Sequence, residues 1–366
     1  MRKLILRLSI LTLTFWISLD SFSQKVINTQ IFDDYFNQIE GFNGNILVAI
    51  DGQPIFIKSY GLANLELSVK NTKDTKFCIG SLTKQFTSMA IFILYERGAI
   101  KLDDKITKYI DNLPTSWRDI TIHQLLNHTS GLMHSFASEE FKMAISNKRT
   151  IDEVISSFYD KPLVSKPGEK ANYSGLGYFI LAKIIQNVSG MPYEDFLYNE
   201  IFKKAEMENT GAYNPSLIYR NMASGYQKRD NEIRNADYIY LPILTGGGNL
   251  YSTLEDLMKW SQLFNSEVLI SDSTKNKMLT PAFEDMACGI GHGKIKLEKE
   301  GNKDNYISDS VITIGHGGWV PGFSSRIDMF PEKKILIIKL SNGDYFEQMW
   351  NDSFTKLVLR EIYNND

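Results

Sequence analysis

The sequence predicts an α+β fold, in which segments from both ends of the chain form one antiparallel sheet and the middle forms a mostly helical lobe. Two apolar-rich runs, 44–50 and 55–60, flank an Asp-Gly pair that is typical of a β-hairpin turn. Near the other end, the runs 326–330 and 335–340 flank a polar turn and predict a second hairpin. Strands at both ends with helical spacing between them indicate helices packed on an antiparallel sheet.

The helices of the middle segment have recognisable starts and ends. Residues 81–97 carry apolar side chains at helical spacing and stop at Gly98. Residues 177–188 form a second such run, which ends at Gly190. Other starts are predicted from capping-box patterns and from a final apolar repeat. A short helix is expected to open at Thr121, capping boxes begin at Thr150 and Ser252, and the terminal helix is expected over 347–363.

Length and composition favour one large catalytic domain over residues 24–366. The chain has 366 residues, of which 43% are hydrophobic, enough for a large buried core. We expect a sheet lobe from about 30–80 and 285–366, and a helical lobe over about 81–284. A cleft between two such lobes is a natural place for a ligand.

The first 23 residues are typical of an export signal. Arg2 and Lys3 precede a short apolar stretch, and Ser21-Phe22-Ser23 provides a small-x-small cleavage site. We therefore expect cleavage near Gln24 and a periplasmic or secreted protein. The alternative is an uncleaved N-terminal membrane anchor.

Charge and metal-ligand spacing exclude several classes of function. The formal net charge of −3, with scattered Lys and Arg, indicates no nucleic-acid surface. The histidines 123, 134 and 292 lack metal-site spacing, so no metal or other cofactor is expected. Cys78 and Cys288 could pair in an oxidising compartment, but we favour two small buried hydrophobic residues.

The pattern Ser81-Leu82-Thr83-Lys84 carries the first chemical signal. Residues three apart on a helix share a face, so the Ser81 hydroxyl and the Lys84 amine would be neighbours. A serine hydroxyl needs a nearby base to act as a nucleophile, and a lysine serves when burial or a nearby cation lowers its pKa. A helix start at Ser81 would also supply backbone N–H donors to an oxyanion.

The S-x-x-K pattern alone is weak, because the chain contains it twice. The second copy begins at Ser353 and lies in the predicted terminal helix with little chain after it. Ser81 instead opens an apolar helix and has further motifs downstream, which the second copy lacks. Ser81 is therefore the predicted nucleophile.

Four downstream segments resemble landmarks of the β-lactamase-related serine hydrolases, which include class C β-lactamases, D-alanyl-D-alanine carboxypeptidases and related esterases. Residues 167–178 (PGEKANYSGLGY) resemble the Y-x-N segment, and residues 314–323 (IGHGGWVPGF) resemble the third motif with His in place of Lys. Residues 125–132 (LLNHTSGL) and 246–253 (GGGNLYST) are similar to two other landmarks. The resemblance implies a β-lactamase/transpeptidase-like fold.

The resemblance also implies a role for each matching residue. Ser81 would form an acyl-enzyme, and Lys84 would either take its proton or hold Tyr173 as a phenolate. Tyr173 would relay the proton to the leaving group. The implied oxyanion hole consists of the N–H groups of Ser81 and Trp319. The implied substrate-binding residues are His316, Gly317 and Gly318.

Outside that set, the sequence gives two structural interpretations. His128 ends a capped helix before Thr-Ser-Gly, so we interpret it as a turn residue. The glycines 246–248 lack the Lys and Ser/Thr of a P-loop, so we interpret them as positions of close backbone packing.

Two departures from the family pattern bear on the substrate. Gly175 stands where Y-x-N has its Asn, and His316 stands where the third motif has its Lys. Both changes argue against β-lactam hydrolysis while the Ser-Lys-Tyr core is retained. We expect a serine hydrolase acting on a small ester, amide or D-amino-acid peptide. The alternatives are a class C-like β-lactamase and a non-catalytic relative that binds cell-wall peptide.

Overall fold

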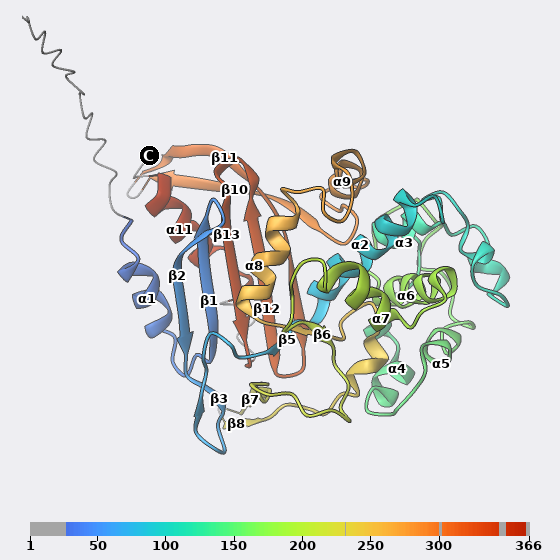
Figure 1. Cartoon of the computed structure of the whole chain (residues 1–366), viewed down its shortest axis with the longest axis horizontal. Coiled ribbons are helices and arrows are strands. Elements are labelled where there is room, and N and C mark those ends of the chain that lie inside the picture. The colour runs from blue at the N-terminus through green and yellow to red at the C-terminus, as the bar shows by residue number, and fades with distance from the viewer. Residues whose placement is uncertain (1–26, 231, 300–301, 344–348, 364–366) are drawn as a thin grey trace, which may run out of the picture.

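The computed structural model describes residues 27–363, apart from 231, 300–301 and 344–348. A large antiparallel sheet lies beside a helical region, and the first and last described segments of the chain both lie on the side of the sheet (Figure 1). The predicted export segment, residues 1–23, lies outside the described residues. Within the described part of the chain, no helix is long and apolar enough to cross a membrane.

The sheet has six strands in the order β10-β11-β12-β13-β1-β2. Both predicted hairpins are confirmed, and the N-terminal strand β1 pairs with the C-terminal strand β13, with Gly44 opposite Ser341. The sheet strands are β1 (Gly44–Ile50), β2 (Gln53–Tyr60), β10 (Gly291–Lys299), β11 (Asn302–Val320), β12 (Phe323–Phe330) and β13 (Ile335–Ser341). The sequence-based prediction of one sheet built from both ends is therefore correct.

The outer face of the sheet is covered by α1 (Gln30–Asn37) and α11 (Ser353–Tyr363), as Figure 1 shows. The fully buried Phe354 of α11 joins the two helices, because its ring lies 5.9 Å from that of Phe32 and 4.8 Å from that of Phe36. Helix α11 begins at Ser353; the start expected at 347 lies outside the described residues, and residues 349–350 are also helical.

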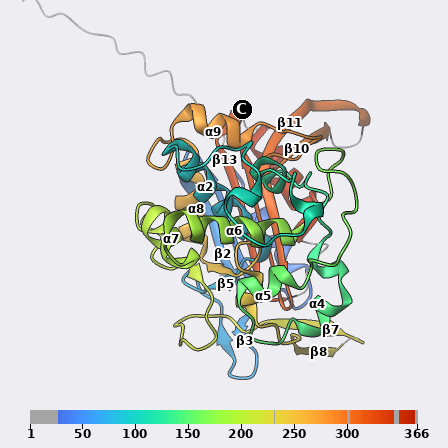
Figure 2. The same cartoon turned by 90° about the vertical axis from the view of Figure 1, so that its right-hand side faces the viewer.

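The inner face of the sheet meets α8 (Leu254–Leu263), which packs on β13 and β1. Although α8 falls inside the segment predicted as a helical lobe, it covers the sheet. The lobe itself surrounds α2 (Thr83–Glu96) and α6 (Gly175–Ser189), and Figure 2 looks onto it. Its other helices are α3 (Ile122–Leu126), α4 (Glu139–Ala144), α5 (Ile151–Ser156), α7 (Tyr193–Leu197) and α9 (Asp272–Leu279).

Short strands connect these layers. A three-stranded sheet has the order β5-β9-β6 and leads into α2, while the pairs β3-β4 and β7-β8 form separate two-stranded sheets. Their bounds are β3 (Leu62–Asn64), β4 (Val69–Lys70), β5 (Phe77–Cys78), β6 (Gly211–Ala212), β7 (Tyr226–Arg229), β8 (Glu232–Asn235) and β9 (Leu250–Ser252).

The predicted helix start at Thr121 and the predicted capping box at Thr150 are confirmed, and Thr121 forms a capping box as well. The third prediction is wrong by one residue: Thr253 caps α8 by accepting the Asp256 N–H, while Ser252 still belongs to strand β9. The Ser252 hydroxyl instead lies 2.7 Å from that of Thr210. Helix α6 ends at Gly190 in the left-handed conformation, as predicted.

The ring cluster around Phe354 predicts the effect of a large-to-small substitution on stability. Phe354→Ala would leave a cavity between α1, α11 and the sheet, so we expect the free energy of unfolding to fall by about 3–5 kcal/mol. Urea denaturation followed by circular dichroism measures the change. Leu67→Ala, at a side chain that is 77% exposed, is the control and should change stability by less than about 0.5 kcal/mol. Equal losses in the two variants would contradict this packing.

Candidate active site

Ser81 lies in a tight turn between the sheet region and helix α2. Strand β5 ends at Cys78, Gly80 takes a positive φ of 50°, and residues Gly80–Leu82 form a 3-10 turn. Helix α2 then begins at Thr83, so Lys84 stands in its first turn. Ser81 therefore lies directly before α2, close to the predicted position, but in the 3-10 turn and not in the α-helix itself.

Lys84 is almost completely buried, with 2% of its surface exposed. Its Nζ donates to the carbonyl oxygen of Gly247 at 2.6 Å and to Ser81 Oγ at 3.0 Å. Burial disfavours the charged ammonium and lowers the pKa of Lys84 to about 7. A substantial fraction of Lys84 is therefore a neutral amine at neutral pH, next to the Ser81 hydroxyl.

Tyr173 joins this pair from the segment just before α6. Its side chain hydrogen-bonds with Ser81, and Lys84 Nζ lies 5.0 Å from the centre of its ring. Burial raises the pKa of Tyr173 above its ordinary value, so the phenol is neutral at physiological pH. The structure thus brings together the three side chains that the sequence motifs selected.

Close backbone packing holds the Ser81 turn against strand β11. A Cβ on Gly318 would lie 2.0 Å from the carbonyl oxygen of Ile79, and a Cβ on Gly80 would lie 2.6 Å from the backbone nitrogen of Trp319. Ser325 of β12 donates its hydroxyl to the same Ile79 oxygen at 2.8 Å. This contact places the backbone of Trp319 beside the nucleophile turn, where the resemblance locates the oxyanion hole.

The glycines 246–248 pack as the sequence interpretation expected. Gly246 has a φ of 83°, and a Cβ there would lie 2.5 Å from the carbonyl oxygen of Tyr178 in α6. The following residue, Gly247, supplies the carbonyl that binds Lys84. This loop therefore acts in the site through its backbone.

The third-motif residues divide between two roles. His316 and Gly317 line the same cavity as Ser81, and the His316 ring lies 6.1 Å from that of Tyr173. Burial, and then the nearby Lys84, lower the pKa of His316 to about 4, so its imidazole is neutral at pH 7. Gly318 does not line this cavity and makes the close contact with Ile79 described above.

The cavity at Ser81 has a volume of about 640 Å³. Apolar side chains form much of its wall, including Phe136, Met286 and Ile290. Its polar end carries Arg326 and Asp328 of β12, where Arg326 Nε lies 2.8 Å and 2.9 Å from the two carboxylate oxygens. The charge of Arg326 is thus largely balanced within the wall.

Two histidines of this cavity were not assigned to the site from sequence. The ring of His128 lies 4.4 Å from that of Tyr173, and the ring of His134 lies 5.4 Å from it. His128 does adopt a turn conformation, with φ of 61°, but it also contacts the catalytic tyrosine candidate. The family landmark at 125–132 could have indicated that both histidines belong to the site, because it contains His128 and ends two residues before His134.

Gly175 does not face the substrate cavity, as its alignment with the Asn of the Y-x-N motif had suggested. It is buried at the start of α6, and a Cβ there would lie 2.7 Å from Ser135 Oγ. It does not line the cavity at Ser81. The absence of an Asn at this position therefore gives no direct information on contacts with a substrate's acyl group.

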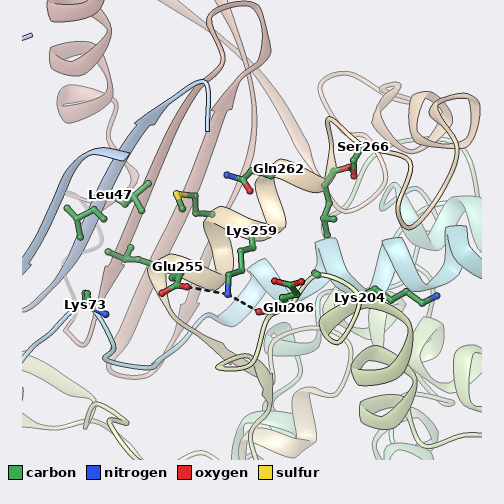
Figure 3. A pocket seen from close by; sticks show the side chains of 13 residues that line it. Leu47, Lys73, Lys204, Glu206, Glu255, Lys259, Gln262 and Ser266 are labelled. Carbon is green, nitrogen blue, oxygen red and sulfur yellow. Dashed lines mark hydrogen bonds and ion pairs between the residues drawn. The ribbon is translucent and has the colours of Figure 1, made fainter. Parts of the chain in front are cut away.

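A second cavity, of about 630 Å³, lies between α8 and strand β1. Its wall includes Leu47, Glu206 and Gln262, while Lys259 bonds to the Glu206 carbonyl and to Glu255 (Figure 3). None of its lining residues belongs to the group Ser81, Lys84 and Tyr173. The chemistry of the motifs therefore points to the other cavity.

The other reactive side chains of the described region do not form a competing centre. Cys78 and Cys288 are both free and buried, and burial raises the pKa of each thiol to about 12. Among the described residues, no group of three His, Cys, Asp or Glu side chains could hold a metal ion. Ser353 is exposed on α11 and does not line the cavity at Ser81.

The fold and the Ser-Lys pair define a protein of the serine hydrolase class that includes the penicillin-binding enzymes. The family model described as Beta-lactamase matches residues 32–358, so the chain belongs to this family. Penicillin-binding protein 4* of Bacillus subtilis (strain 168) is 29% identical over 325 residues, which are 83% of this chain and 68% of that protein.

Solved structures agree with this assignment. The octameric penicillin-binding protein homologue from Pyrococcus abyssi superposes with a TM-score of 0.74 at 26% identity, covering 87% of this chain and 74% of that one. The D-amino acid amidase from Ochrobactrum anthropi SV3 gives a TM-score of 0.76 at 22% identity, covering 92% and 98%, and shows that the fold is shared.

Proposed function

We propose that this protein hydrolyses a small ester, amide or D-amino-acid peptide through an acyl-enzyme on Ser81. The observation that carries the proposal is the 3.0 Å contact between Ser81 Oγ and a buried lysine amine whose pKa is lowered to about 7. A neutral amine at this distance can take the hydroxyl proton as Ser81 attacks a carbonyl carbon. The family assignment supports the same class of chemistry.

The two pKa shifts favour Lys84 over a Tyr173 phenolate as the base. The pKa of Lys84 falls toward neutrality, while that of Tyr173 rises further from it. Lys84 would therefore accept the Ser81 proton. Neutral Tyr173 would pass its phenol proton to the leaving group and take the proton held by the Lys84 ammonium in exchange, which restores both groups. The N–H groups of Ser81 and Trp319 would stabilise the oxyanion. In the second half of the reaction, the same groups would activate water against the acyl-enzyme.

The charge of the cleft favours a neutral substrate. His316 is uncharged at pH 7, and Arg326 is engaged by Asp328. A substrate carboxylate would thus find little uncompensated positive charge beside Ser81. Burial also lowers the pKa values of His128 and His134. This supports simple esters and amides over β-lactams, and the retained base argues against a purely binding role.

The first test compares the two S-x-x-K serines. Ser81→Ala removes the nucleophile, so we expect kcat on a p-nitrophenyl ester to fall by about 10⁴- to 10⁶-fold with the fold retained. Ser353→Ala is the matched control and should keep full activity. Intact mass after incubation with a fluorophosphonate should show one adduct in the parent and in Ser353→Ala, and none in Ser81→Ala. Retained turnover in Ser81→Ala, with loss in Ser353→Ala, would mean that the other serine is the nucleophile.

The second test is the pH dependence of ester hydrolysis. Below the lowered pKa of about 7, Lys84 is protonated and cannot accept the Ser81 proton, so kcat/KM should fall about tenfold per pH unit. Above pH 7 it should reach a plateau. Because the pKa of Tyr173 is raised above its ordinary value of about 10, no decline from its ionisation is expected up to pH 10. A profile that rises only near pH 10 would instead indicate a phenolate base.

The third test concerns substrate class. We expect kcat/KM for a p-nitrophenyl ester to exceed that for penicillins and cephalosporins, because His316 offers no positive charge to their carboxylate. His316→Lys should raise the cephalosporin-to-ester ratio by about ten- to a hundredfold, the range of a charged hydrogen bond. Gly175 is left unchanged, since an Asn there would collide with Ser135.

The control for this substitution is His123→Lys, which adds the same charge on α3 outside the cavity lining. Its cephalosporin-to-ester ratio should match that of the parent. A parent that hydrolyses nitrocefin near the diffusional limit, or an unchanged ratio in His316→Lys, would show that residue 316 does not set the substrate class.

A further inference from the structure

His128 contacts the segment of Tyr173 in a way that a turn residue alone does not require. Its carbonyl oxygen accepts the N–H of Asn172 at 2.8 Å, and its Nδ1 accepts the N–H of Ser174 at 3.1 Å. The backbone amides on both sides of Tyr173 are therefore bound to one residue. The ring of that residue lies 4.4 Å from the Tyr173 ring, with an angle of 32° between their planes.

Neighbouring groups add to this connection. Asn172 Nδ2 donates to the carbonyl oxygen of Leu132 at 2.9 Å, and Ser174 Oγ donates to that of Met133 at 2.8 Å. The segment before α6 is thus held along its length by the loop that follows α3. His128 combines a bond to each flanking amide with a ring that faces Tyr173, and the ring of His134 also faces Tyr173, at 5.4 Å.

The hydrogen bond from Ser174 fixes the protonation of the imidazole. Because Nδ1 accepts an N–H, the ring proton of the neutral form must be on Nε2. A charged imidazolium would place a second proton on Nδ1, against the Ser174 N–H. His128 is 1% exposed, and its Nε2 has no hydrogen-bond partner within the described chain. The ring is therefore built into the wall as a neutral group.

We propose that His128 is a positioning residue for Tyr173: through the two flanking amides and the ring contact, it holds the phenol against Ser81 and beside Lys84. This inference rests on the proposed function, since it assigns a device that serves the Ser81 reaction. Displacing a reacting group by about 1 Å can lower a rate by about a hundredfold, so such a device would affect kcat.

Two substitutions separate the parts of this contact. His128→Gly removes the ring and the Nδ1 acceptor but accommodates the positive φ of 61°. His128→Asn also tolerates that φ and retains a side-chain acceptor for the Ser174 N–H. We expect kcat on an ester to fall about 10- to 100-fold in the Gly variant with KM changed less than about threefold, and to recover substantially in the Asn variant. His123→Ala, on α3 outside the cavity lining, should behave as the parent.

A double-mutant cycle with Tyr173→Phe decides whether His128 acts through the phenol. If it does, adding His128→Gly to Tyr173→Phe should reduce kcat by less than about threefold more, because the hydroxyl being positioned is already absent. Losses that multiply in the double variant, an unchanged kcat in His128→Gly, or an Asn variant as slow as the Gly variant would overturn the proposal. Should the Gly variant fail to fold, the same cycle is run with His128→Asn, which also tolerates the positive φ, and the loss in the Tyr173→Phe background is judged by the same threefold limit.

Labelling of Ser81 by the fluorophosphonate distinguishes this outcome from a failure of the proposed function. A parent that neither forms the adduct nor turns over ester would refute the hydrolase proposal itself. A parent that does both, combined with multiplying losses in the cycle, would refute only the positioning role of His128.

Discussion

The active site depends on the burial of a single amine. Lys84 is held in a nearly water-free position between the Gly247 carbonyl and the Ser81 hydroxyl. Removing an ammonium from water is unfavourable by several kcal/mol, so the protein relieves that penalty by favouring the neutral form. The neutral form is also the one that can act as a base. Stability and chemistry therefore impose the same requirement on this side chain.

That burial is achieved by backbone contacts between segments distant in sequence. Strand β11 approaches the Ser81 turn at Gly318, the 246–248 loop approaches α6 at Gly246, and both approaches leave no room for a Cβ. Because well-packed interiors transmit small displacements, the position of the amine is tied to the register of the sheet. The glycines of the family motifs thus act on the chemistry indirectly, by setting how closely the sheet and the helical lobe meet.

The sequence predicted much of this arrangement, and the failures share a physical cause. Hairpin turns and the S-x-x-K spacing are local signals, so both hairpins and the Ser81–Lys84 contact are found as expected. The sequence alone could not predict which neighbours a side chain would meet at a position occupied by glycine. Gly175 therefore resembled a substrate-facing position, although a Cβ there would meet Ser135. His128 was interpreted only as a turn because its contact with Tyr173 spans two segments 45 positions apart, from 128 to 173.

The electrostatics of the cleft follow from the same exclusion of water. Desolvation that neutralises Lys84 also keeps His316 neutral, and the partly protonated lysine opposes a second positive charge nearby. A Lys at position 316 would face the same repulsion, which would lower the pKa of both amines. Here Arg326, which lines the cavity on the strand beside His316 and Gly317, is paired with Asp328. In the proposed reaction, the cleft would therefore hold a substrate by shape and apolar contact, and oriented backbone N–H dipoles would stabilise its reacting carbonyl.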